Sequence, residues 1–159
     1  MTRLALFDLD GVLADDDHRI QFALDKKWPE YFNLDRVASD GVHPKGETMV
    51  ATMQNLGWSI GYLTARRWDL RDVTEAWLDT HGFPPGRLIM RSALQKMRAG
   101  EYKALEMGAL IGRNVFEGLV LFDDDPEVIR TVAEVHGEQH VSHCTWSVKP
   151  DSLVKYATI

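Results

Sequence analysis

Short apolar runs alternate with segments of helical periodicity along this sequence of 159 residues, and this alternation is the feature that most constrains its fold. The runs at 3–8 and 118–123 are almost continuously apolar, which is typical of parallel strands covered on both faces. Five runs in all predict strands, at 3–8, 58–64, 87–91, 118–123 and 139–144. The alternation favours an α/β fold with a doubly wound, Rossmann-like parallel sheet in three layers.

The segments between these runs carry apolar residues three and four positions apart, which predicts helices. The predicted helices cover 46–56, 69–78, 102–111 and 127–135. Turn-forming residues agree with these boundaries, because Gly57 and Gly82 follow two of the helices and Asp125-Pro126 is a good start for the last one. We therefore expect a single domain, 1–159, with a small helical insert at about 14–44.

The composition is that of an ordinary globular protein, with 45% apolar and 26% charged residues. No apolar run is long enough to cross a bilayer, and the first residues lack a signal-peptide pattern. Cys144 is the single cysteine, which excludes an internal disulfide and fits a reducing compartment. We therefore expect a cytoplasmic protein with no membrane partner. The net charge of −6 argues against strong nonspecific binding to nucleic acid phosphates.

Polar residues end three of the predicted strands. They are Asp8, Thr64 and Asp123, and Asp10 follows the first of them by two residues. Ligands of doubly wound sheets bind beyond the carboxyl ends of the strands, so we expect these side chains to converge on one site. Asp8 and Asp10 repel each other there unless a cation offsets their charge.

Four motifs, in this order, resemble those of the haloacid dehalogenase-like superfamily of phosphatases and phosphotransferases. They are Asp8-Leu9-Asp10-Gly11-Val12-Leu13, Leu63-Thr64-Ala65-Arg66, Lys103 and Phe122-Asp123-Asp124-Asp125. The resemblance extends from residue 4 to about residue 130, with Val12 where many relatives have Thr. It implies a haloacid dehalogenase-like fold and a Mg²⁺-dependent phosphatase.

The resemblance also implies a role for each motif residue. Asp8 would be the nucleophile that forms an aspartyl phosphate, and Asp10 would be the general acid and base. Thr64 and Lys103 would bind the phosphoryl oxygens, with Lys96 as the competing candidate for the lysine. The ligands of Mg²⁺ would be Asp8, the backbone carbonyl of Asp10, Asp123 and, through a water or a hydrogen bond to Lys103, Asp124.

There is little room for a cap over this site. Only about 30 residues, 14–44, can form an insert after the first motif, and the core itself needs 65–102. We therefore expect no large cap and an open site, which favours a bulky substrate such as a polymer end unless a second subunit closes the site. Asp15, Asp16 and Asp17 are expected in a solvated turn or at a helix N-terminus, and Asp125 is expected to cap a helix.

Two arginines point to a phosphorylated nucleic acid end or a nucleotide as substrate. Arg19 and Arg66 match positions that bear on substrate phosphate in the 3′-phosphatase domain of phage polynucleotide kinases, which the sequence also resembles. A guanidinium fork suits phosphate geometry. Ala65 departs from the glycine of that family's motif, and Ala99 stands where an acid is expected. No GxxxxGK[ST] motif occurs, so a kinase domain is missing.

The leading hypothesis is a phosphatase of polynucleotide 3′ ends that acts through an aspartyl phosphate. The alternative is a 5′(3′)-nucleotidase on free nucleoside monophosphates, and a remote alternative is a catalytically silent binding module on the same fold. Trp28, Tyr31 and Trp68 are candidates for stacking a base, with packing in a local core as the other interpretation.

Overall fold

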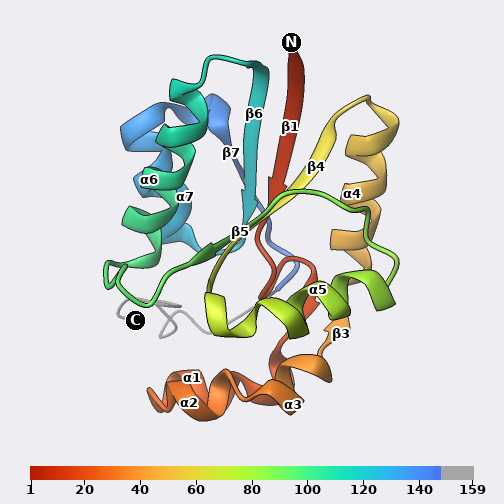
Figure 1. Cartoon of the computed structure of the whole chain (residues 1–159), viewed down its shortest axis with the longest axis vertical. Coiled ribbons are helices and arrows are strands. Elements are labelled where there is room, and N and C mark those ends of the chain that lie inside the picture. Colours follow the sequence, from red (N-terminus) through yellow and green to blue (C-terminus); the bar gives the residue numbers. More distant parts are fainter. Residues whose placement is uncertain (148–159) are drawn as a thin grey trace.

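The fold is built on a five-stranded parallel sheet, seen in a computed structural model that describes residues 1–147 (Figure 1). The strand order is β5-β4-β1-β6-β7, so β1 is central. The strands are β1 (Thr2–Phe7), β4 (Ser59–Arg67), β5 (Leu88–Arg91), β6 (Phe116–Asp123) and β7 (Val141–His143). All four pairings are parallel, and each predicted strand is present.

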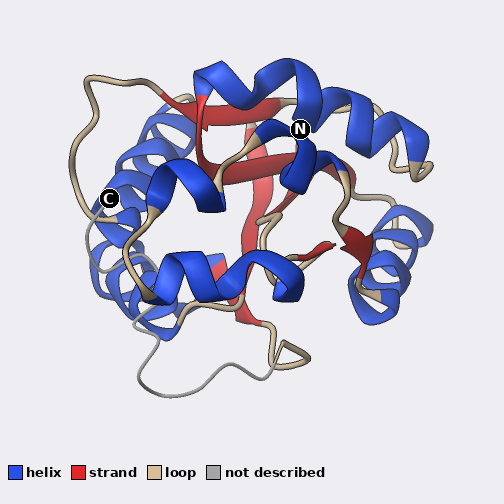
Figure 2. Cartoon of the chain, turned by 90° about the horizontal axis from the view of Figure 1, so that it is seen from below, coloured by secondary structure: helices blue, strands red, loops and turns tan. Residues whose placement is uncertain are grey.

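Helices cover both faces of this sheet (Figure 2). The four long helices are α4 (Pro44–Asn55), α5 (Arg71–Thr80), α6 (Ala99–Gly112) and α7 (Pro126–His136). Side chains of β1 alternate between two apolar clusters: Leu6 joins residues of α6 and α7, whereas Phe7 joins residues of α4 and α5. Both faces of the central strand are therefore buried, and the predicted doubly wound, three-layer α/β fold is confirmed.

A small insert lies beyond the carboxyl ends of the strands, at the bottom of Figure 1. Two short antiparallel strands, β2 (Ala14–Asp15) and β3 (Gly41–Val42), form its base. Between them are the 3-10 turn η1 (Asp17–Arg19) and the helices α1 (Ile20–Leu24), α2 (Trp28–Tyr31) and α3 (Leu34–Ala38). Two further 3-10 turns, η2 (Trp68–Leu70) and η3 (Glu138–His140), follow β4 and α7. Within the described part of the chain, no helix has the length and apolar character needed to cross a membrane.

Asp16 corrects one expectation about the insert. Asp17 begins η1 and is exposed, and Asp16 precedes it, so both lie at a helix N-terminus as predicted. Asp15 lies in β2 instead, and Asp16 is fully buried, not solvated. The reason is that the insert folds over it and brings the hydroxyl of Tyr31, which donates to Asp16 Oδ2 at 2.5 Å. This bond supplies a partner that a buried carboxylate requires.

The loop that follows β1 is held by close backbone contacts. Gly11 has a φ of 87°, which an L side chain rarely adopts, and its N–H donates to the carbonyl of Ala14 at 2.8 Å. A Cβ on Gly46 in α4 would lie 2.1 Å from the carbonyl oxygen of Val12. The indole of Trp146 donates to that same oxygen at 2.9 Å. The chain can therefore turn at once after Asp10 and stay fixed there.

Candidate active site

Asp8, Thr64 and Asp123 lie near the carboxyl edge of the sheet: Asp8 directly follows β1, Thr64 is on β4 and Asp123 ends β6. Phe7 is in register with Phe122, so the residues that follow, Asp8 and Asp123, are neighbours across the two central strands. All three polar side chains are at least 95% buried. The structure therefore brings the three residues to the same edge of the sheet, as expected for the carboxyl ends of parallel strands.

Lys103 reaches these carboxylates from α6. Its Nζ lies 2.9 Å from Asp8 Oδ1 and 2.6 Å from Asp123 Oδ2. Burial alone would lower the pKa of Lys103, but the charges and hydrogen bonds of Asp123 and Asp8 outweigh it and raise that pKa above its usual value. Lys96 lies exposed in the loop before α6, so the structure brings Lys103 and not its competitor to the acids.

The residues expected to bind a metal form a compact group. Carboxylate oxygens of Asp8, Asp123 and Asp124 lie within 4.8 Å of one another. Several carboxylate oxygens around one point suit a hard divalent cation such as Mg²⁺, so the donor set fits the predicted ion. The side chain of Asp10 is not in this group, and a contribution from its backbone carbonyl stays a prediction.

The carboxylate of Asp10 instead accepts hydrogen bonds from two arginines. Arg66 donates to it twice, from Nε at 3.1 Å and from Nη2 at 2.7 Å. Arg19 Nη2 donates to the same carboxylate at 2.5 Å. Both guanidinium groups are almost completely buried. Two positive charges at this distance favour the ionised form of the Asp10 carboxylate.

Asp40 completes this cluster, and sequence reasoning missed it. Its carboxylate accepts from Arg19 Nε at 2.8 Å and from Arg19 Nη2 at 2.6 Å, and Arg66 Nη2 is 3.3 Å away. Trp77 of α5 donates to the backbone carbonyl of Asp40 at 2.8 Å. Burial raises the pKa of Asp40, although its bonds to Arg19 oppose that shift. We call Asp10, Arg19, Asp40 and Arg66 the ionic quartet.

The ionic quartet shows where the two predicted phosphate-binding arginines lie. Arg19 is also stacked on the Tyr31 ring, with its guanidinium carbon 4.3 Å from the ring centroid. Burial opposes the charge of Arg19 and Arg66, but Asp10 and Asp40 raise the pKa of both above the usual arginine value. Both arginines therefore stay charged beside the site, with carboxylates as their partners in this structure.

Asp125 follows the metal-binding group and caps α7, as predicted. Its carboxylate accepts from the backbone N–H of Glu127 at 2.9 Å, and its own N–H donates to Asp123 Oδ1 at 2.9 Å. Burial, together with the charge of Asp123, raises the pKa of Asp125 to about 7. Its surroundings therefore favour the protonated form of this carboxyl more than water does.

The three-layer α/β fold is one that haloacid dehalogenase-like hydrolases also have. The family model described as "PITM 1-3, LNS2 domain" matches residues 5–117. The chain therefore belongs to this LNS2 domain family. A search of the curated proteins found no significant match.

Solved structures of low sequence identity share the fold. A chain of the Pnkp1/Rnl/Hen1 RNA repair complex matches with a TM-score of 0.68 at 16% identity, over 91% of this chain and 42% of that one. The chain thus spans less than half of that protein. A haloacid dehalogenase-like hydrolase from Streptococcus pneumoniae matches with a TM-score of 0.66 at 12% identity, over 99% and 91% of the two chains. The class C acid phosphatase from Bacillus anthracis matches with a TM-score of 0.58 at 16% identity, over 89% and 65%.

Proposed function

We propose that this protein is a Mg²⁺-dependent phosphomonoesterase that acts through an aspartyl phosphate on the 3′ end of a nucleic acid. The observation that carries the proposal is the buried contact of Lys103 with both Asp8 and Asp123, beside a third carboxylate. Three carboxylates beside one ammonium group leave excess negative charge in a buried place, which a divalent cation would offset. Ligands of such sheets bind at this edge, so a phosphate together with that cation suits the site.

Asp8 is the nucleophile in this mechanism. One of its carboxylate oxygens bonds to phosphorus while the bond from phosphorus to the leaving oxygen breaks, which gives an aspartyl phosphate. Lys103 stays between Asp8 and Asp123 and donates to the phosphoryl oxygens as charge spreads over them, together with the Thr64 hydroxyl. Bound to Asp8, Asp123 and Asp124, Mg²⁺ would supply neutralising charge at the phosphoryl group.

Asp10 moves the proton in both halves of the reaction. It protonates the leaving oxygen, and it then takes a proton from the water that hydrolyses the acyl phosphate. The two guanidinium groups on Asp10 suit the second task, because they favour its ionised form. To donate a proton, Asp10 has to lose some of its hydrogen bonds with the two arginines. The Asp40 carboxylate accepts from both arginines as well, so they keep an acceptor when Asp10 is protonated.

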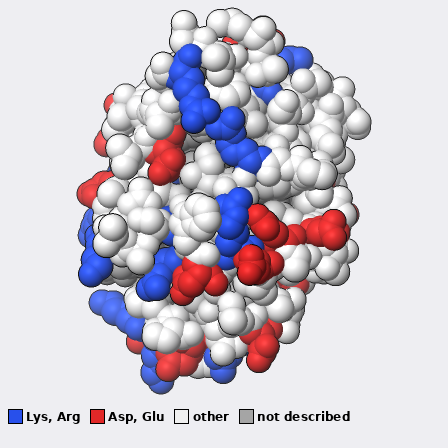
Figure 3. All heavy atoms as spheres, in the orientation of Figure 1, with Lys and Arg blue, Asp and Glu red and all other residues white. Residues whose placement is uncertain are grey.

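Two observations support a nucleic acid end as the substrate. Arg19 and Arg66 lie next to Asp10, and a similar fold occurs in an RNA repair complex. One observation favours the alternative, a 5′(3′)-nucleotidase. On the face seen in Figure 3 a short band of basic side chains lies above a region where acidic and basic side chains alternate, which is not the broad basic surface typical of polynucleotide binding. A cytoplasmic location and closure of the site by a second subunit stay predictions.

The test is phosphate release in the presence and absence of Mg²⁺, from a 3′-phosphorylated oligonucleotide and from nucleoside monophosphates measured side by side. We expect Mg²⁺-dependent turnover that is fastest on the oligonucleotide and that Asp8→Asn abolishes. Asp17→Asn, an exposed acid of the insert, is the matched control and should keep full activity. Faster turnover of mononucleotides would favour the nucleotidase, full activity of Asp8→Asn would exclude the aspartyl phosphate, and no turnover of any ester would favour a silent binding module.

A further inference from the structure

Trp68 is a large aromatic side chain left open to solvent at the carboxyl edge of the sheet. Three aromatic residues are candidates for base stacking. Tyr31 is fully buried in the apolar cluster that contains residues of α6 and α7, and Trp28 packs against that cluster. Trp68, in contrast, is 55% exposed. Trp68 begins η2 directly after β4, two residues beyond Arg66 of the ionic quartet. Trp68 is therefore close along the chain to a residue of the candidate active site.

The ring of Trp68 is held in place from one side. The guanidinium carbon of Arg71 lies 4.7 Å from the ring centroid. Arg71 is itself fixed, because its Nε lies 2.9 Å from Glu75 Oε1 and its Nη1 donates to the carbonyl of Leu88 at 3.3 Å. An indole supported on one face by an anchored guanidinium and exposed elsewhere is a preformed surface for another planar group.

The strand register gives the distance from the reacting carboxylate. Asp8 follows Phe7, which pairs with Tyr62, so Asp8 is level with Leu63 of β4. A bulge in β4 places Arg67 only two positions of β5 beyond Leu63, because these residues pair with Arg91 and Ile89. At about 3.3 Å per residue, Trp68 lies ~10 Å farther along the strand direction than Asp8. The backbone of Trp68 therefore lies beyond that of Asp8 on the side of the sheet where its strands end.

We propose that Trp68 stacks on a nucleobase of the substrate, beside the phosphoryl site. This inference rests on the proposed function and adds the part of the substrate that is recognised besides its phosphate. Because every base has a flat face, stacking on Trp68 selects nucleotides over sugar phosphates or other small monoesters but does not select among bases.

The test is binding, measured by fluorescence anisotropy with a labelled 3′-phosphorylated oligonucleotide. Asp8→Asn is the background in all proteins, so that the ligand stays intact. The second ligand is the same oligonucleotide without its 3′-terminal bases. We expect Trp68→Ala to raise Kd for the intact ligand about 5- to 150-fold and to leave Kd for the abasic ligand unchanged. Trp68→Phe, which keeps a flat ring, should retain most of the affinity.

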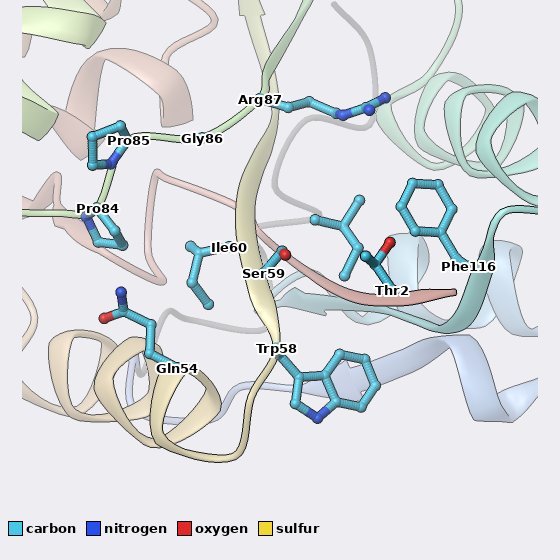
Figure 4. A pocket seen from close by; sticks show the side chains of 11 residues that line it. Thr2, Gln54, Trp58, Ser59, Ile60, Pro84, Pro85, Gly86, Arg87 and Phe116 are labelled. Carbon is cyan, nitrogen blue, oxygen red and sulfur yellow. The ribbon is translucent and has the colours of Figure 1, made fainter.

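Trp58 offers a matched control at the other end of β4. It lies just before β4, at the opposite edge of the sheet, in a pocket of about 510 Å³ shown in Figure 4. It too carries an arginine, with the guanidinium carbon of Arg3 5.4 Å from its ring centroid. We expect Trp58→Ala to leave both Kd values unchanged, with thermal melting used to show that each variant is folded.

Four results would overturn the stacking inference: no binding of the intact ligand, equal Kd values for Trp68→Ala and its parent, equal weakening toward the abasic ligand, or equal weakening by Trp58→Ala. Failure of the proposed function looks different. With Asp8 restored, hydrolysis of glycerol phosphate by the parent protein tests the chemistry alone, because this ester has no base. If no ester releases phosphate, the proposed phosphatase activity is wrong. The ratio of the Kd values for Trp68→Ala and its parent then still decides whether Trp68 stacks on a base.

Discussion

The Nζ atom of Lys103 lies 2.9 Å from Asp8 Oδ1 and 2.6 Å from Asp123 Oδ2, so the proposed nucleophile and Asp123 share one ammonium group. These three side chains come from α6, β1 and β6, and all are at least 95% buried. One ammonium group between two carboxylates leaves a net negative charge in a buried place. Such an arrangement is poorly suited to stability alone and well suited to holding a further cation.

Replacing Lys103 by Met should impair both activity and stability. Phosphate release should fall about 10²- to 10³-fold, because a donor to the phosphoryl oxygens is lost. Without Mg²⁺, the free energy of unfolding should fall by about 3–5 kcal/mol, since two buried carboxylates lose their shared partner. Urea unfolding and an assay of phosphate release measure the two effects.

Lys96→Met is the control for this change, because Lys96 is the exposed lysine that competes with Lys103 in the sequence. Its activity and stability should both stay near those of the parent protein. A loss of activity confined to the Lys96 variant would show that the wrong lysine had been placed in the site.

Replacing Asp40 by Ala should destabilise the protein by about 3 kcal/mol, although Asp40 belongs to no motif. It leaves Arg19 and Arg66 buried with Asp10 as the remaining carboxylate of the ionic quartet, and loss of one partner in a buried ion pair is costly. His18→Ala is the matched control: His18 Nε2 is 2.8 Å from the same carboxylate, but its side chain is 41% exposed. It should cost less than about 1 kcal/mol in urea unfolding. Equal losses in the two variants would argue against a structural role for the buried arginines.

The fold and the positions of Asp8 and Asp123 could be predicted because they depend on local sequence patterns. Continuous apolar runs identify buried parallel strands, and the residue that ends such a run lies at the binding edge of the sheet. Asp8 and Asp123 follow from that rule alone. The strand β4 continues to Arg67, beyond the predicted end at 64, and its pairing with β5 shifts register between Leu63 and Arg67.

Asp40 could not be predicted because its role exists only in three dimensions. It lies at the end of the insert, whose helices are four or five residues long and give no clear periodicity. Its partners are 21 and 26 positions away in the sequence. The burial of Asp16 could not be predicted for the same reason. The acidic run around it resembles a solvated segment, and its partner Tyr31 is 15 positions away in the sequence.

Adding Mg²⁺ should raise the melting temperature, and chelation with EDTA should reverse the effect. An ion that binds only the folded protein stabilises it by about 2.7 kcal/mol at a concentration 100 times its Kd. Asp124→Asn removes one of the three clustered carboxylates and should weaken this response, whereas the exposed Asp79→Asn should keep it. A response that is equal in the parent and both variants would place the ion elsewhere.

Asp125 should make the stability depend on pH between about 4 and 7. Burial and the charge of Asp123 raise its pKa to about 7 in the folded protein, well above the usual aspartate value. The folded protein therefore holds this proton more tightly than the unfolded chain does, so the contribution is fully present below about pH 4 and is lost as the pH rises toward 7. Asp125→Asn removes the titration but keeps a side chain that caps α7 equally well.

The variant should thus gain stability relative to the parent as the pH increases from 4 to 7, with a constant advantage above that range. Urea unfolding in EDTA at pH values from 4.5 to 8.5 measures the difference. Asp69→Asn is the control, because the Asp69 side chain is 64% exposed and its pairing with Arg67 lies at the surface. Its difference from the parent should stay flat over the same range. An advantage of Asp125→Asn that shrinks with rising pH would mean that the folded protein favours the charged carboxylate, which is the opposite of what burial beside Asp123 implies.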